Sequence, residues 1–285
     1  MALDYDTLLA ANIPAKEQVY TERDTILYAL GVGFGHDPLD ERELRFVYER
    51  DLQAPPTYAS TLAWTRFADV DVGYTYTKLV HSEQRMIIHQ SLAPAGEVVS
   101  QLRVKDAVDR GSEKGALIYF ERTLREKNSG ALISTTTLTL LARADGGFGG
   151  PAGPVLEPHP IPERAADLVV EQRVSPRAAL IYRLNGDVNP LHVDPAAARA
   201  SGFDRPILHG LATYGVIGGV VLRSVCDFDS TRLKELDGRF SSPVFPGDTV
   251  VTELWIDGET VTLRAKSKET GATVFNNGRA RVTSG

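Results

Sequence analysis

The feature that most constrains the fold is an internal repeat. Residues 175–184 match residues 21–30 in their capping position, their apolar pair and their tyrosine. A stretch rich in Gly and Pro, residues 146–154, lies between the two copies and is typical of a connector. At 285 residues the chain is long enough for two domains. We therefore predict two similar domains, residues 1–145 and residues 155–285, joined by this linker.

Hydrophobic periodicity predicts the elements of each domain. Helical spacing or composition occurs in four segments: 21–30, 37–54, 176–184 and the long apolar segment 207–226. Period-two alternation, which indicates strands, occurs in four others: 79–89, 97–109, 115–124 and 131–143, with a hairpin turn at 128–130. Since so apolar a long helix must be buried, we expect an α+β fold. In each domain a curved antiparallel sheet would wrap around one long apolar helix.

Charge and cysteine content exclude several classes of protein. The net charge of −6 argues against a general binder of nucleic acid or anionic membranes. Cys226 is the one cysteine of the sequence, which excludes an intrachain disulfide and a cysteine-based zinc cage. No apolar run reaches membrane-spanning length, and the first residues are acidic where a signal peptide is basic. We expect a cytoplasmic protein that neither binds nucleic acid nor inserts into membranes.

An acid and a base lie close together in the second repeat. Asp187 follows Asn185-Gly186, which is a natural left-handed end for the preceding helix. His192 precedes Asp194-Pro195, which is typical of the cap and first residue of a new helix. The short bridge between two helix ends should hold Asp187 and His192 near a common point. This arrangement suits acid–base chemistry on a bound water.

The start of the long helix adds a donor for a developing negative charge. Backbone N–H groups there lack intrahelical partners, and Gly210 lets a substrate approach the backbone closely. An acid–base pair and an oxyanion donor together suit addition of water to a C=C bond conjugated with a thioester. The weaker alternative is a metal site of four residues: Asp187, His192, Asp194 and His209. Nucleophilic catalysis is weaker still, because Ser201 and Cys226 have no local signature.

The segment from Tyr182 to Pro195 resembles the hydratase 2 motif of the MaoC-like dehydratases, which adopt a hot-dog fold. The first half, including Tyr28-Ala-Leu-Gly-Val-Gly and Leu79-Val-His-Ser-Glu-Gln, resembles the N-terminal domain of double hot-dog hydratase 2 enzymes. The resemblance implies two tandem hot-dog domains. It also implies a hydro-lyase that performs (R)-specific hydration of trans-2-enoyl-CoA to (3R)-3-hydroxyacyl-CoA, and the reverse dehydration.

The resemblance also implies roles for the residues of the motif. Asp187 and His192 would activate a water and move its proton to the α-carbon, and Gly210 would donate its N–H to the thioester oxygen. No metal or redox cofactor is implied. Gly33 occupies the position of Asp187 in the first repeat. The N-terminal domain should therefore shape a substrate tunnel without a dyad of its own.

Substrate contacts follow from the same resemblance. His81 and Ser82 are expected to border the acyl-CoA, with Arg110 near the CoA phosphates and Phe240 near the pantetheine or adenine. Ser82 stands where the family commonly has Gly, and Arg110 stands where Lys is common. Three further substrate contacts are expected within the motif: Tyr182, Asn185 and Asn189.

Two other functions remain open. A 3-hydroxyacyl-ACP dehydratase of fatty-acid synthesis would use the same dyad, although the negative net charge disfavours docking of an acidic carrier protein. A non-catalytic acyl-CoA-binding subunit would not need an intact dyad. The resemblance further implies a homodimer.

Overall fold

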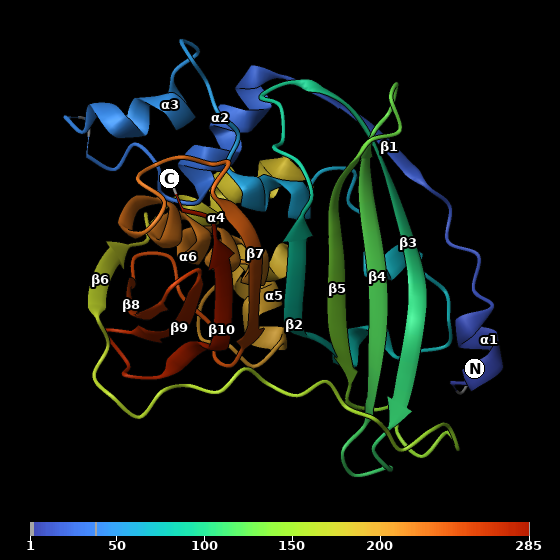
Figure 1. Ribbon diagram of the computed structural model, residues 1–285. Coiled ribbons are helices and arrows are strands. Elements are labelled where there is room, and N and C mark those ends of the chain that lie inside the picture. The colour runs from blue at the N-terminus through green and yellow to red at the C-terminus, as the bar shows by residue number, and fades with distance from the viewer. Residues whose placement is uncertain (1–2, 38, 285) are drawn as a thin grey trace.

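The chain forms one ten-stranded antiparallel sheet with helices on one of its faces (Figure 1). The computed structural model describes residues 3–37 and 39–284. The first half contributes β1 (Lys16–Tyr20), β2 (Leu79–Ile88), β3 (Gly96–Asp109), β4 (Ala116–Glu126) and β5 (Leu132–Ala142). The second half contributes β6 (Leu168–Arg173), β7 (Leu233–Phe240), β8 (Thr249–Asp257), β9 (Thr260–Ser267) and β10 (Thr273–Val282). All four strands predicted in the first half are confirmed.

The strand order repeats the duplication seen in the sequence. The order across the sheet is β1-β3-β4-β5-β2-β7-β10-β9-β8-β6, so both halves have the same order when read inward from the sheet's edges. The halves join where β2 pairs with β7, with Met86 opposite Leu236 (Figure 1). Residues 143–167 connect β5 to β6 without regular secondary structure. The division into domains remains a prediction, because the sheet continues through both halves.

A long apolar helix, α6 (Gly210–Ser224), packs against the inner face of the sheet and is almost wholly buried. Close packing requires its glycines: a Cβ on Gly215 would lie 2.5 Å from a methyl carbon of Val32. The helix begins three residues later than predicted. The reason is that the Leu208 N–H donates to the carbonyl of Val244 at 2.7 Å, which keeps the preceding residues extended. No helix of the described ranges is long and apolar enough to cross a membrane.

The other helices are shorter, and the first of them packs on β3, away from α6 (Figure 1). They are α1 (Tyr5–Leu9), α2 (Glu22–Gly31), α3 (Leu44–Val47), α4 (Ala178–Tyr182) and α5 (Pro195–Ala200). Single 3₁₀ turns occupy Glu41–Glu43, Pro56–Ser60, Phe67–Asp69, Tyr76–Lys78, Arg183–Asn185 and Pro190–His192. The repeat-equivalent helices α2 and α4 pack against each other. This contact brings the two copies of the repeated segment together behind the sheet.

Two helix predictions in the first half are wrong. The helix predicted at 37–54 is limited to a 3₁₀ turn and α3, because Tyr48 is extended and the Gln53 N–H turns back to the Arg45 carbonyl at 2.6 Å. Residue 38 lies outside the described residues. The long helix expected in the first domain is also reduced to the turn Pro56–Ser60. There the buried Arg122 guanidinium binds the carbonyls of Ala59 and Leu62, which a continuing helix would use itself.

Candidate active site

Local turn chemistry fixes the bridge that carries the predicted acid and base. After α4 the chain makes a 3₁₀ turn and reverses at Gly186, whose φ of 119° is left-handed. The Asn189 carboxamide oxygen accepts from the Leu191 N–H at 3.1 Å, which caps the turn Pro190–His192. The Asp194 carboxylate accepts from the Ala196 N–H at 2.8 Å and caps α5. Both predicted helix ends are confirmed, and Asp194 serves as a cap.

His192 is oriented as a base. Its ring is buried, with 8% of the residue exposed. The Nδ1 atom lies 2.9 Å from the carbonyl oxygen of Ile207. Since a carbonyl only accepts, Nδ1 must carry the proton, and the neutral ring keeps a lone pair on Nε2. Burial lowers the pKa of His192, and the nearby Asp187 carboxylate partly offsets that shift.

Asp187 lies beside this ring on the half-buried turn. One Asp187 carboxylate oxygen accepts from the Asn189 N–H at 3.2 Å. Asp187, His192 and His209 each bring one side-chain N or O atom within 4.8 Å of the others. Partial burial raises the pKa of Tyr76, which belongs to the first half of the chain, and the negative charge of the nearby Asp187 raises it further. The predicted dyad is thus assembled at a point that both halves of the chain approach.

His209 and Gly210 complete this group at the start of α6. The His209 ring stacks on that of His192 with centroids 3.7 Å apart, and its Nε2 lies 3.1 Å from the Asp187 carbonyl. Burial, followed by the neighbouring His192, lowers the pKa of His209 to about 3, so this ring is neutral. Gly210 is the first residue of the helix and has the Phe240 ring beside it. Its N–H therefore lacks an intrahelical partner.

The predicted substrate contacts are only partly brought together. The His81 ring packs edge-on against the Phe240 ring, with centroids 5.1 Å apart. Since the Phe240 ring also lies beside Gly210, it connects β2 to the start of α6. The Ser82 hydroxyl, beside His81 at a β-bulge, donates to the Thr139 carbonyl at 2.9 Å. Arg110 is exposed on the turn between β3 and β4, where its backbone N–H donates to the Gly115 carbonyl at 3.0 Å, and its side chain makes no hydrogen bond or ion pair within the described residues.

The three motif residues predicted to bind substrate have local surroundings in the turn. The Tyr182 ring is buried, with its centroid 4.9 Å from that of His209, and its hydroxyl has no partner among the described residues. The Asn185 amide donates to the Tyr182 carbonyl at 3.0 Å. Asn189 caps its own turn, as described above. Their roles in substrate binding remain predictions.

The geometry suits hydrogen bonding better than metal chelation. The rings of His192 and His209 are nearly parallel, at 27°. His192 Nδ1 and His209 Nε2 each face a carbonyl. The remaining ring lone pairs lie in two stacked planes, whereas ligands of one ion must converge on it. The sequence analysis grouped His209 with Asp187 and His192 only in the metal alternative, and it did not predict the bond of His209 to the Asp187 carbonyl or its stacking on His192.

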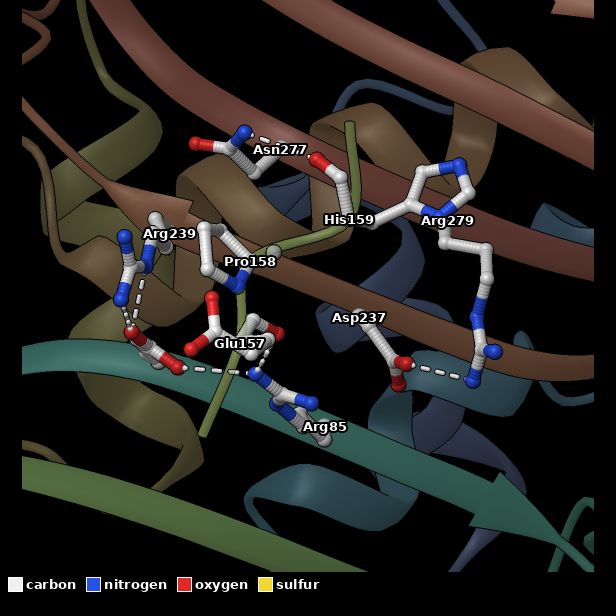
Figure 2. A pocket seen from close by; sticks show the side chains of 10 residues that line it. Arg85, Glu157, Pro158, His159, Asp237, Arg239, Asn277 and Arg279 are labelled. Atoms are coloured by element: carbon white, nitrogen blue, oxygen red, sulfur yellow. Dashed lines mark hydrogen bonds and ion pairs between the residues drawn. The ribbon is translucent and has the colours of Figure 1, made fainter. Parts of the chain in front are cut away.

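A second polar site lies on the other face of the sheet, at the β2–β7 seam (Figure 2). Gln84 and Met86 are buried toward α6, so the alternating residues Glu83 and Arg85 point away from it. The cavity there measures about 150 Å³ and is lined on one side by residues 157–159, from the segment that connects β5 to β6. Its charges pair with one another: Glu83 binds Arg239 and Arg85, and Asp237 binds Arg279 at 2.8 Å. These bonds stabilise the seam and are separated from the dyad by the sheet.

Fold and site together define a double hot-dog protein in which Asp187 and His192 lie together beside the start of a helix. Two family models match the chain: "MaoC like domain" over residues 158–277 and "MFE-2 hydratase 2 N-terminal domain" over residues 19–144. The chain belongs to the MaoC-like hydratase 2 family, which confirms the resemblance and the α+β hot-dog fold.

Named relatives cover nearly the whole chain. The peroxisomal enoyl-CoA hydratase 2 of Arabidopsis thaliana is 37% identical over 95% of this chain and 93% of its own length. Enoyl-CoA hydratase ChsH3 of Mycobacterium tuberculosis is 37% identical over 90% of this chain and 91% of its own. The crystal structure of a MaoC-like dehydratase from Phytophthora capsici superposes with a TM-score of 0.87 and 30% identity, covering 98% of this chain and 99% of that one.

Proposed function

We propose that this protein hydrates trans-2-enoyl-CoA to (3R)-3-hydroxyacyl-CoA and catalyses the reverse dehydration. The observation that carries the proposal is the orientation of His192. Its Nδ1–H faces the Ile207 carbonyl, which leaves the Nε2 lone pair available beside Asp187. Two relatives that cover most of the chain are named enoyl-CoA hydratases, which supports the substrate class.

The reaction divides among three groups. His192 and Asp187 hold a water whose oxygen adds to C3 of the enoyl group, and they accept the proton that this water loses. The electron pair of the C2=C3 bond shifts to form a C1=C2 bond, and the carbonyl pair moves onto the thioester oxygen, which gives an enolate that the Gly210 N–H stabilises. When the carbonyl reforms, the proton is delivered to the α-carbon. Atoms and charge balance with water as the only co-reactant, so the reaction as proposed uses no metal or redox cofactor.

The finer assignments belong to the same proposal. Among the predicted contacts, His81 and Phe240 have the best support as acyl-CoA contacts, because their rings meet beside Gly210. Arg110 is exposed and free to meet a phosphate from solvent. A homodimer in the cytoplasm is our expectation. A peroxisomal location is the alternative, because a relative is named peroxisomal. Sedimentation of the purified chain and imaging of a tagged copy test these two points.

The decisive experiment measures hydration of trans-2-decenoyl-CoA by loss of enoyl-thioester absorbance, with chiral analysis of the product. Wild type should form the (3R) product, and Asp187→Asn and His192→Ala should each reduce kcat by about 10²-fold or more. Asp194→Asn is the matched control, because Asp194 caps a helix and should affect stability more than turnover. A folded wild type that turns over no short, medium or bulky enoyl-CoA would contradict the proposal. Turnover of carrier-protein thioesters alone would favour the dehydratase alternative.

A further inference from the structure

One buried imidazole contacts all three parts of the site. His209 directly precedes Gly210, its ring stacks on that of His192, and its Nε2 lies 3.1 Å from the backbone carbonyl of Asp187. These three partners lie on different segments: the start of α6, a 3₁₀ turn and the loop after Gly186.

The protonation state of His209 follows from its partners. A carbonyl only accepts, so Nε2 must carry the proton that it donates to Asp187. Burial lowers the pKa of His209 to about 3, which leaves Nδ1 without a proton at neutral pH. Nδ1 is buried and has no partner among the described residues. The neutral ring therefore acts as one donor and one flat apolar surface.

The burial of His209 prevents its ring from meeting the substrate directly, unlike Asp187 and His192. Only 1% of the residue is exposed, and its one proton is committed to a backbone carbonyl. His192, by contrast, keeps a free Nε2. A group shielded in this way can act on the reaction only through the residues that it holds. The other titratable groups that face the ring are Tyr182, Asp187, His192 and, at longer range, Arg183.

We propose that His209 is a positioning residue, which rests on the function proposed above. Its Nε2–H holds the loop that presents the Asp187 carboxylate, and its ring holds the plane of the His192 imidazole. Because it also directly precedes the helix-opening residue, it sets both against the Gly210 N–H. The ring further shields one face of His192 from water. The bond and the ring surface are separable, so two substitutions can test them independently.

His209→Gln keeps an Nε2–H donor at similar reach but removes the aromatic face. His209→Phe keeps an aromatic face but removes the donor. We expect the Phe variant to lose about 10- to 100-fold in kcat with little change in KM, because a small misplacement of a catalytic group has effects of this size. The Gln variant should lose less in kcat than the Phe variant, because it keeps the donor to the Asp187 carbonyl. In the Gln variant, water reaches His192, so the acid limb of the pH–rate profile should move to higher pH. In the Phe variant this limb should stay in place.

An NMR titration of ¹⁵N-labelled His192 provides a readout that does not depend on turnover. It should show the Nδ1–H tautomer in wild type, a raised His192 pKa in the Gln variant and an unchanged pKa in the Phe variant. Equal kcat losses in both variants with equal drops in Tm would overturn the inference, because they indicate only a packing role. Unchanged kcat in the Phe variant would overturn it as well. If wild type fails to hydrate any enoyl-CoA, the proposed function fails while the titration still tests how His209 shields His192.

Discussion

Replacing Gly210 with proline should remove one donor from the site and change little else in the fold. Gly210 is the first residue of α6, where proline is well tolerated because its φ is preset for a helix and no intrahelical bond is lost. His209 already has φ −58° and ψ 138°, and this ψ suits a residue before proline. Because no native hydrogen bond of the helix is broken, the free energy of unfolding of Gly210→Pro should lie within about 1 kcal/mol of the wild-type value.

The effect on catalysis should be large. In the proposed reaction, the Gly210 N–H meets the charge that develops on the thioester oxygen. Loss of one such donor costs about 10²- to 10³-fold in kcat, or about 3–4 kcal/mol of transition-state stabilisation. Gly210→Ala is the matched control, because it keeps the N–H. An alanine Cβ would lie 3.8 Å from two carbons of the Phe240 ring, an ordinary van der Waals distance. Its kcat should stay within a few-fold of wild type.

The assay is steady-state hydration of trans-2-decenoyl-CoA, with thermal unfolding of each variant in parallel. A proline variant that keeps wild-type kcat would refute the oxyanion role of this N–H. Equal losses in the proline and alanine variants would refute it too, because alanine retains the donor. A fall in kcat confined to the proline variant, at unchanged Tm, is the result that the structure predicts.

Two further predictions concern stability. Burial lowers the pKa of His81 to about 4 and that of His209 to about 3, so below the ordinary histidine pKa of about 6.5 the unfolded chain binds protons that the folded chain does not. The free energy of unfolding should therefore fall as the pH is lowered from about 6.5 to about 4, and urea titrations of His209→Gln should show a shallower fall; parallel curves would contradict this. The Tyr214 hydroxyl donates to the Leu236 carbonyl at 2.7 Å, so Tyr214→Phe should cost about 1 kcal/mol. The Tyr182 hydroxyl has no partner among the described residues, so Tyr182→Phe should not lower stability, and a similar loss in both variants would count against this difference.

Short-range signals in the sequence were sufficient for the bridge that carries the dyad. Asn185-Gly186 and Asp194-Pro195 are local instructions: a left-handed residue ends one helix, and a carboxylate cap begins the next. Their geometry depends on a few neighbouring residues, so it could be predicted without the fold. The strands of the first half were predictable for the same reason, because alternation along one strand records which face is buried.

Long-range contacts decided what local patterns could not. The apolar stretch after Pro56 does not form the expected long helix. Its carbonyls at Ala59 and Leu62 instead accept hydrogen bonds from Arg122, which lies on a strand that is distant in sequence. The pairing of β2 with β7 likewise depends on closing a long loop, which leaves no periodic trace in either strand.

The sequence by itself determined the duplication, the α+β class, the strands of the first half and the helix ends that flank Asp187 and His192, which remain the predicted acid and base. Only the tertiary structure decided how these groups face one another. The His192 tautomer depends on the Ile207 carbonyl, and the Asp187 loop depends on His209, which lies 22 residues away in the chain. Hydrogen-bond direction and ring stacking are properties of atoms brought together by folding. Residue type and spacing alone therefore predict the acid–base pair but leave its orientation undetermined.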